Sequence, residues 1–256
     1  MLGLVDDLPK VALVALATLV ALLRLWSVLD LWTVTAMRLR RAWALGGRRR
    51  VVVLLALGVF ACVAEDVLEG EHDESVLWLD RQVRHALARS APDLHHPASL
   101  VSHLTGDGLA VTVPIVGAAL VIARRRREAV TLLLGTLGAW LVSGILKTML
   151  AVPRPRAGPP WKWYASFGFP SGHTLVTIVA CGLIVWALAR RASRRRRLVL
   201  IVAGVLVAAA AGAARIALSA HWTSDVIAGL AAGVVWLYLV VSLAERWLTL
   251  PAARAT

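Results

Sequence analysis

The 256-residue sequence predicts an all-α fold, a polytopic membrane helix bundle with a six-span core. Three observations indicate this fold: 59% of the residues are hydrophobic, the mean hydropathy is +0.74, and the apolar residues gather in long uncharged runs. A single core of ordinary size cannot bury so much apolar surface, so lipid is the expected solvent. Because the runs are continuous rather than alternating, they favour helices over the strands of a membrane barrel.

Six uncharged runs predict the individual membrane spans. Flanking residues extend each run toward the ~20 residues that cross about 30 Å of hydrocarbon. The runs are Val51–Ala64, Gly108–Ala123, Ala129–Leu146, Thr174–Ala189, Leu198–Ala214 and Val226–Ala244. A further run, Val11–Leu23, predicts an extra N-terminal helix that either spans the membrane or lies at its interface.

The arginines predict how these spans are oriented. Eighteen of the 28 basic residues fall on one side of the membrane if the six spans alternate, including the runs Arg124–Arg127 and Arg194–Arg197. The positive-inside rule places this side in the cytoplasm. We therefore expect a multi-pass protein of the cell membrane with a cytoplasmic C-terminus. We attribute the net charge of +13 to topology and anionic lipid rather than to nucleic acid.

The same pattern predicts the domain organisation. Residues 1–50 hold the N-terminal hydrophobic segment and a basic cytoplasmic linker, residues 51–247 form the membrane domain, and residues 248–256 form a short cytoplasmic tail. In the outer segment Glu65–Asp107, the apolar spacing of Ser75–Ser90 predicts an amphipathic helix on the membrane surface. The histidines of this outer segment match no metal-binding spacing, and we interpret them as polar loop residues. They are His72, His85, His95, His96 and His103.

Two polar clusters flank membrane spans on the outer side, where ionisable residues are costly and indicate function. In the first cluster, Lys147 ends one span and Arg154 follows on a proline-rich loop. The second cluster, Pro170–His173, begins the next span. Its Gly172 lets a ligand approach the backbone, and the free N–H groups of a helix N-terminus favour an anion. Its His173 can exchange a proton near neutral pH.

A third outer cluster extends from Arg215 to Asp225. The spacing of His221 and Asp225 lets the carboxylate reach one imidazole nitrogen, which fixes the tautomer and leaves the other nitrogen free to attack. Thr223 or Ser224 is expected to cap the helix that follows.

The three clusters together predict a site for a phosphate group. Three cations and a helix N-terminus match a phosphate dianion, and two histidines match a nucleophile and a general acid. Asp225 is the only carboxylate in the three clusters, so we expect no metal site.

These clusters resemble the signature of the type 2 phosphatidic acid phosphatase family, which reads K-x6-RP, PSGH and SR-x5-H-x3-D. The corresponding segments here are Lys147–Pro155, Pro170–His173 and Arg215–Asp225, and all spacings agree. The resemblance covers roughly Val51–Ala244. One residue departs from it: Ala214 stands where the family usually has Ser, which removes one supporting hydrogen bond but not the nucleophile.

The resemblance implies a role for each motif residue. His221 attacks phosphorus and forms a phosphohistidine, Asp225 orients and stabilises it, and His173 protonates the leaving lipid alkoxide. The family uses no metal or other cofactor. The residues that the resemblance assigns to phosphate binding are Lys147, Arg154, Arg215, Ser171 and Gly172.

The loop between the first two clusters adds further polar and aromatic residues. Its aromatic residues are typical of anchors at the level of the lipid headgroups. The alternative is that Arg156, Lys162 and Trp163 contact the headgroup of the substrate.

The expected function is metal-independent hydrolysis of a membrane lipid phosphate at the outer face, with a phosphatidate-type monoester as the first choice. Phosphatidylglycerol phosphate is a further candidate substrate. The alternative within enzymes is a polyprenyl-diphosphate phosphatase. The alternative of another class is a non-catalytic lipid-phosphate binder or transporter. His173, His221 and Asp225 argue against the latter, because a binder needs cations but no proton relay.

Overall fold

The computed structural model describes residues 36–69, 75–152 and 167–249. The expected N-terminal helix Val11–Leu23 lies outside these ranges. Four residues of the expected site also lie outside them: Arg154, Arg156, Lys162 and Trp163. The chain divides into two units, residues 1–58 and 59–256.

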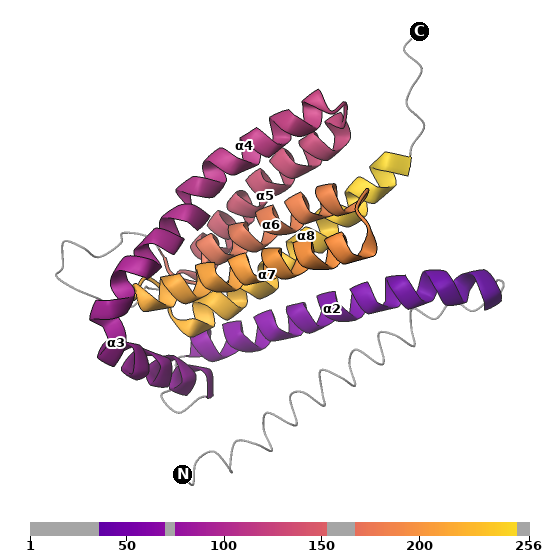
Figure 1. The fold of residues 1–256 in the computed structure, drawn as a ribbon. Helices are drawn as coiled ribbons and strands as arrows, with labels where there is room; N and C mark the ends of the chain where they lie inside the picture. Colours follow the sequence, from indigo (N-terminus) through magenta and orange to yellow (C-terminus); the bar gives the residue numbers. More distant parts are fainter. Residues whose placement is uncertain (1–35, 70–74, 153–166, 250–256) are drawn as a thin grey trace. The chain divides into compact units, whose positions relative to one another are not determined.

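All regular structure in the described ranges is helical (Figure 1). The helices are α2 (Ala36–Glu69), α3 (Ser75–Thr105), α4 (Asp107–Ile122), α5 (Arg126–Leu150), α6 (Gly172–Ala189), α7 (Arg194–Ala217) and α8 (Thr223–Thr249). The first unit contributes the start of α2. The second contains the rest of α2 and all of the other helices in this list.

Six helical segments in the described ranges are long and apolar enough to cross a membrane, which confirms the predicted six-span bundle. They are Arg50–Leu68, Leu94–Ile122, Arg126–Leu150, Gly172–Ala189, Arg194–Ala217 and Thr223–Thr249. Apolar side chains remain exposed on their outer surfaces; Ile122 on α4, for example, is 84% exposed. Such a surface is suited to lipid rather than to water.

The second span differs from the prediction because it begins at Leu94 rather than near Gly108. The histidines at positions 85, 95, 96 and 103 were interpreted as loop residues, and this is wrong: they lie on α3. Polar residues and Pro97 interrupt the apolar pattern here and conceal the helix from the sequence. Prolines bend helices, and Figure 1 shows α3 bending before it continues toward α4.

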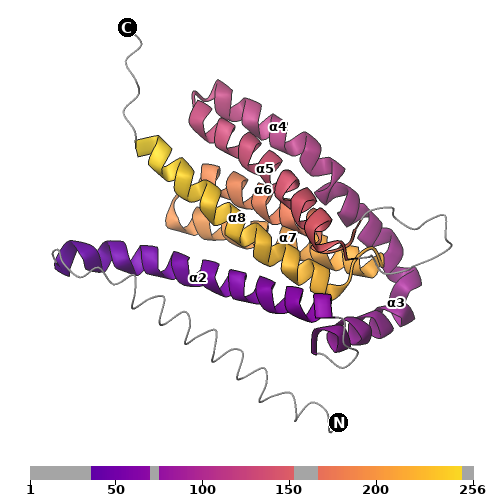
Figure 2. The same cartoon turned by 180° about the vertical axis from the view of Figure 1, so that it is seen from behind.

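Helix α6 lies at the centre of the bundle and packs against α5, α7 and α8 (Figure 2). Leu175, Val179 and Leu183 of α6 are fully buried. Glycines permit the close packing, since a Cβ added at Gly182 would collide with the side chain of Leu237 on α8. Because α6 is central, its first turn lies among the ends of the neighbouring helices, where the polar clusters are found.

Candidate active site

The structure brings the described members of all three polar clusters to one end of the bundle. The backbone N–H of Ser171 donates to the carbonyl of Asp225 at 2.8 Å, which joins the start of α6 to the start of α8. The Nζ of Lys147 donates to the carbonyl of Phe167 at 3.1 Å, which joins the end of α5 to the segment before α6. The order of spans expected from the apolar runs therefore brings the three polar clusters together.

The turn between α7 and α8 sets the spacing between Arg215 and His221. The N–H of Ala220 donates to the carbonyl of Arg215 at 3.0 Å, and the N–H of Ser219 donates to that of Ile216 at 2.9 Å. These two bonds form a Schellman motif, in which the residue after the helix adopts a left-handed conformation. Ser219 does so with φ of 51°. The N–H of His221 also reaches the carbonyl of Arg215 at 3.3 Å, so the helix end brings the backbone of His221 back to that of Arg215.

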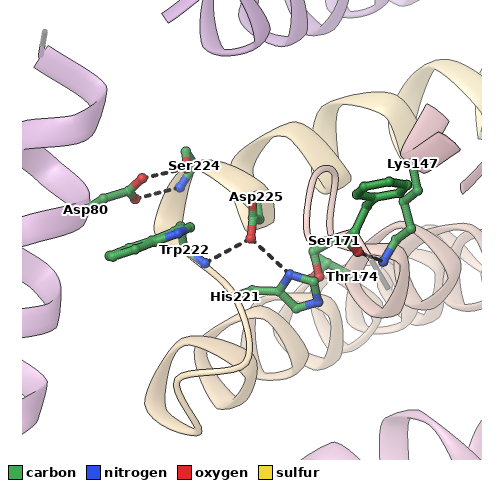
Figure 3. A network of polar contacts seen from close by, with 9 residues as sticks. Asp80, Lys147, Ser171, Thr174, His221, Trp222, Ser224 and Asp225 are labelled. Carbon is green, nitrogen blue, oxygen red and sulfur yellow. Dashed lines mark hydrogen bonds and ion pairs between the residues drawn. The ribbon is translucent and has the colours of Figure 1, made fainter. Parts of the chain in front are cut away.

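His221 and Asp225 form the expected pair. Nδ1 of His221 lies 3.0 Å from Oδ2 of Asp225, and the side chains are only 2% and 1% exposed (Figure 3). A carboxylate oxygen accepts, so Nδ1 carries a proton, and in the neutral ring Nε2 then has the lone pair. The N–H of Trp222 donates to the same oxygen at 3.0 Å. The carboxylate thus fixes both the imidazole ring and the backbone beside it.

The start of α8 is capped by a residue from another helix. We expected Thr223 or Ser224 to cap it, and the structure shows a different arrangement. The Asp80 carboxylate from α3 accepts the N–H of Ser224 at 2.8 Å and its hydroxyl at 2.5 Å (Figure 3). Trp222 precedes the helix and has no side-chain acceptor to offer.

Asp80 lies outside the membrane-spanning segments and is only 3% exposed. Burial raises the pKa of Asp80 above its ordinary value, while the two bonds from Ser224 act in the opposite direction. The first turn of α8 compensates part of the burial cost, because a helix N-terminus favours negative charge.

His173 is held by the end of α3. Its Nε2 lies 3.1 Å from Oγ1 of Thr105, and this hydroxyl donates to the carbonyl of Val101 at 2.8 Å. Thr105 therefore accepts from His173, which assigns the proton to Nε2. Gly106 leaves room for the ring, since a Cβ there would lie 2.6 Å from Cε1 of His173.

Arg215 is also bound by α3, through an Nη1 bond of 3.0 Å to the hydroxyl of Ser102. Helix α3 therefore hydrogen-bonds to the third cluster through Asp80 and Ser102, and to the second cluster through Thr105. Sequence reasoning missed all three residues. A weak signal existed, because Ala98, Ser102 and Thr105 are small residues spaced four and three apart and all are buried.

Close packing fixes the positions of Ser171 and Gly172. Ser171 is fully buried, its Oγ lies 3.0 Å from Oγ1 of Thr174, and it makes no side-chain cap for α6. A Cβ on Gly172 would collide with the hydroxyl of Ser143 and lie 3.4 Å from Cε of Lys147. The first turn of α6 thus approaches α5 as closely as a glycine allows.

Residues 128–248 match the family model described as the PAP2 superfamily. These residues belong to this superfamily. The resemblance to type 2 phosphatidic acid phosphatases is thereby confirmed, and with six apolar spans this PAP2 protein is a membrane phosphatase. A search of curated proteins finds no match to the sequence.

The fold of this PAP2 chain is similar to a solved structure, the first transmembrane PAP2 type phosphatidylglycerolphosphate phosphatase from Bacillus subtilis. The TM-score is 0.64 at 20% sequence identity, over 80% of this chain and 98% of the other. Among the described residues of this chain, no group of three or more His, Cys, Asp or Glu side chains is arranged to hold a metal ion.

The space that Gly106 leaves for His173 gives a testable prediction for this PAP2 site. We expect Gly106→Ala to displace the His173 ring and to lower kcat about 100-fold, since misplacing a reacting group by about 1 Å has effects of this order. Gly108→Ala is the matched control, because a Cβ there meets its nearest neighbour at an ordinary 3.6 Å. Steady-state phosphate release from both variants tests this. Equal rates would show that Gly106 does not set the position of His173.

Proposed function

We propose that this protein hydrolyses the phosphate monoester of a membrane lipid, of phosphatidate type, through a phosphohistidine at the outer membrane face. The observation that supports it most directly is the buried His221–Asp225 pair, which places the proton of a neutral His221 on Nδ1 and so makes Nε2 the attacking atom. Lys147, Arg215 and the first turn of α6 lie at the same end of the bundle and suit a bound phosphate dianion.

In the first step, Nε2 of His221 attacks phosphorus, and the bond from phosphorus to the lipid oxygen breaks. The His221 ring becomes cationic. Asp225 accepts the hydrogen bond from Nδ1–H of this ring and stabilises its charge. His173 acts in its doubly protonated form and transfers its second proton to the leaving alkoxide, so the lipid departs as a neutral alcohol.

In the second step, a water molecule displaces His221 from phosphorus. His173 is now neutral and can accept a proton from this water, so the cycle returns both histidines to their starting state. Lys147, Arg154 and Arg215 hold the phosphate oxygens through both steps, with the N–H of Gly172. We assign Ser171 to holding the start of α6 against α8, because its N–H donates to the carbonyl of Asp225 and its hydroxyl is buried on Thr174.

A groove between α4 and α5 supports a lipid substrate. It has a volume of about 1030 Å³ and leads to Lys147, Gly172 and His173. Its walls are mainly apolar, and wall residues on α5 such as Leu137 and Trp140 are 53% and 66% exposed. Because α4 and α5 belong to predicted spans, the groove faces hydrocarbon, so a lipid chain can lie in it while the phosphate is at the site.

The distribution of arginines supports the outer face. Helices α5 and α7 begin with the arginine-rich segments at Arg126 and Arg194, and the site lies at their opposite ends, beside Lys147 and Arg215. The positive-inside rule then places the site outside and the C-terminus in the cytoplasm of a cell-membrane protein. The headgroup contacts of Arg156, Lys162 and Trp163 remain predictions.

Phosphate release by detergent-purified protein from a lipid panel tests the proposed function. We expect turnover of phosphatidate and of phosphatidylglycerol phosphate, the substrate named for the similar structure, with unchanged rates after chelation of metals. Turnover of a polyprenyl diphosphate alone would favour the alternative enzyme. Binding of lipid phosphates without phosphate release would identify a binder or transporter, and strong inhibition by a chelator would contradict the metal-free mechanism.

Gly144 offers a test of the groove itself. It lines the groove, and a Cβ there would meet nothing within 4 Å, so a side chain can be added without disturbing the packing. We expect Gly144→Phe to lower kcat/KM for long-chain phosphatidate about 10-fold or more by filling the groove. Hydrolysis of a water-soluble phosphate monoester by the same variant should stay near the parent rate. A uniform loss on both substrates would contradict the assignment of the groove.

A further inference from the structure

We propose that Asp80 of α3 is a positioning residue that caps the start of α8 and thereby holds Asp225 and His221 in their reactive arrangement. This inference rests on the proposed function, since it assigns a residue outside the three sequence clusters to the same site. It depends on one juxtaposition, a buried carboxylate on α3 bound to the residue that precedes Asp225 (Figure 3).

The first turn of α8 has only part of a cap from its own sequence. The first N–H groups of a helix have no partner within it, and a side-chain acceptor just before the helix usually binds one of them. Trp222 occupies that position and cannot accept. One half of a capping box is present, because the Asp225 carboxylate accepts the N–H of Trp222. Asp80 supplies the other half from a different helix by accepting the N–H of Ser224.

The Asp80 cap affects the His221–Asp225 pair because the Asp225 carboxylate binds both the start of α8 and the imidazole. Its Oδ2 binds both the N–H of Trp222 and Nδ1 of His221 at 3.0 Å. A shift of the first turn of α8 therefore moves the carboxylate relative to the imidazole. Asp80 opposes such a shift at Ser224, adjacent to Asp225.

A second contact from α3 holds the other side of this turn. The Cζ of Arg84 lies 4.7 Å from the ring centroid of Trp222, within the range of a cation–π interaction. Trp222 follows His221 directly, so α3 holds the neighbour of each member of the pair. Through these two contacts, α3 helps to hold His221 in position.

The experiment compares Asp80→Ala, Asp80→Asn and the control Gln82→Ala, an exposed residue on the same helix. We expect Asp80→Ala to lower kcat about 10- to 100-fold with little change in KM, because the relay is misplaced rather than the substrate lost. Asp80→Asn should retain most of the activity: its carbonyl accepts the N–H of Ser224 and its amide donates to the hydroxyl. Gln82→Ala should match the parent protein.

A double variant separates positioning from general stability. If Asp80 acts through Asp225, adding Asp80→Ala to Asp225→Asn should lower kcat no further, since groups that act as a unit are not additive. The proposal is overturned if Asp80→Ala matches Gln82→Ala, if its effect is undiminished beside Asp225→Asn, or if Asp80→Asn is as impaired as Asp80→Ala. An inactive parent protein would instead contradict the proposed function.

Ser224→Ala keeps the test decisive if Asp80→Ala does not fold. This variant loses the hydroxyl bond to Asp80 and keeps the N–H bond, so the cap is weakened but not removed. We expect a smaller fall in kcat at unchanged KM. A parental kcat in Ser224→Ala would overturn the proposal in that case.

Discussion

His221→Ala is expected to abolish turnover of the lipid phosphate. The variant lacks the nitrogen that attacks phosphorus, and removal of a nucleophile that acts within a relay costs on the order of 10⁴-fold or more in kcat. The same variant should form no covalent phosphoenzyme. Phosphate release from phosphatidate, together with transfer of a radioactive phosphoryl group to the protein, measures both effects.

The label itself identifies the mechanism. A phosphorus–nitrogen bond to histidine breaks in acid and survives alkali, so the label on the parent protein should be lost at low pH. His96→Ala is the matched control, because His96 is an exposed histidine on α3 outside the site, and this variant should label as the parent does. Acid-labile label on His221→Ala would show that another residue is the nucleophile.

The six spans and the second half of α3 differ in how far the sequence predicts them. The six spans were predictable because each is a long apolar run, which needs only local information. The second half of α3 was not, since Pro97 and polar residues interrupt its pattern while tertiary packing keeps it helical. Local composition therefore predicted the bundle and the first half of α3, the surface helix Ser75–Ser90, but not the continuation of α3 beyond it.

The same distinction applies to the site. The clusters around Lys147, His173 and His221 were predictable because each is a short motif beside a span. Their partners on α3 were not, because the three bonds join residues 144, 113 and 68 positions apart. Nothing in the sequence near Asp80 indicates that it faces the protein rather than water.

His173→Ala is expected to lower kcat for phosphatidate by about 10²- to 10⁴-fold, the usual contribution of a general acid. The loss should depend on the leaving group. A lipid alkoxide is a poor leaving group and needs the proton from His173, whereas a nitrophenolate leaves without one. We therefore expect the first step with a nitrophenyl phosphate to remain close to the parent rate, as measured by rapid release of the phenolate.

The second step separates the two tasks of His173. Water must still be activated to hydrolyse the phosphohistidine, and His173 is the proposed base for this step. With the nitrophenyl substrate, His173→Ala should release about one phenolate per site in a burst and then slow as phosphoenzyme accumulates. The His173 ring is held by Thr105 and the His221 ring by Asp225, so we expect His221 to keep its orientation in this variant. An equal loss on both substrates without a burst would mean that His173 positions the phosphate rather than transfers a proton.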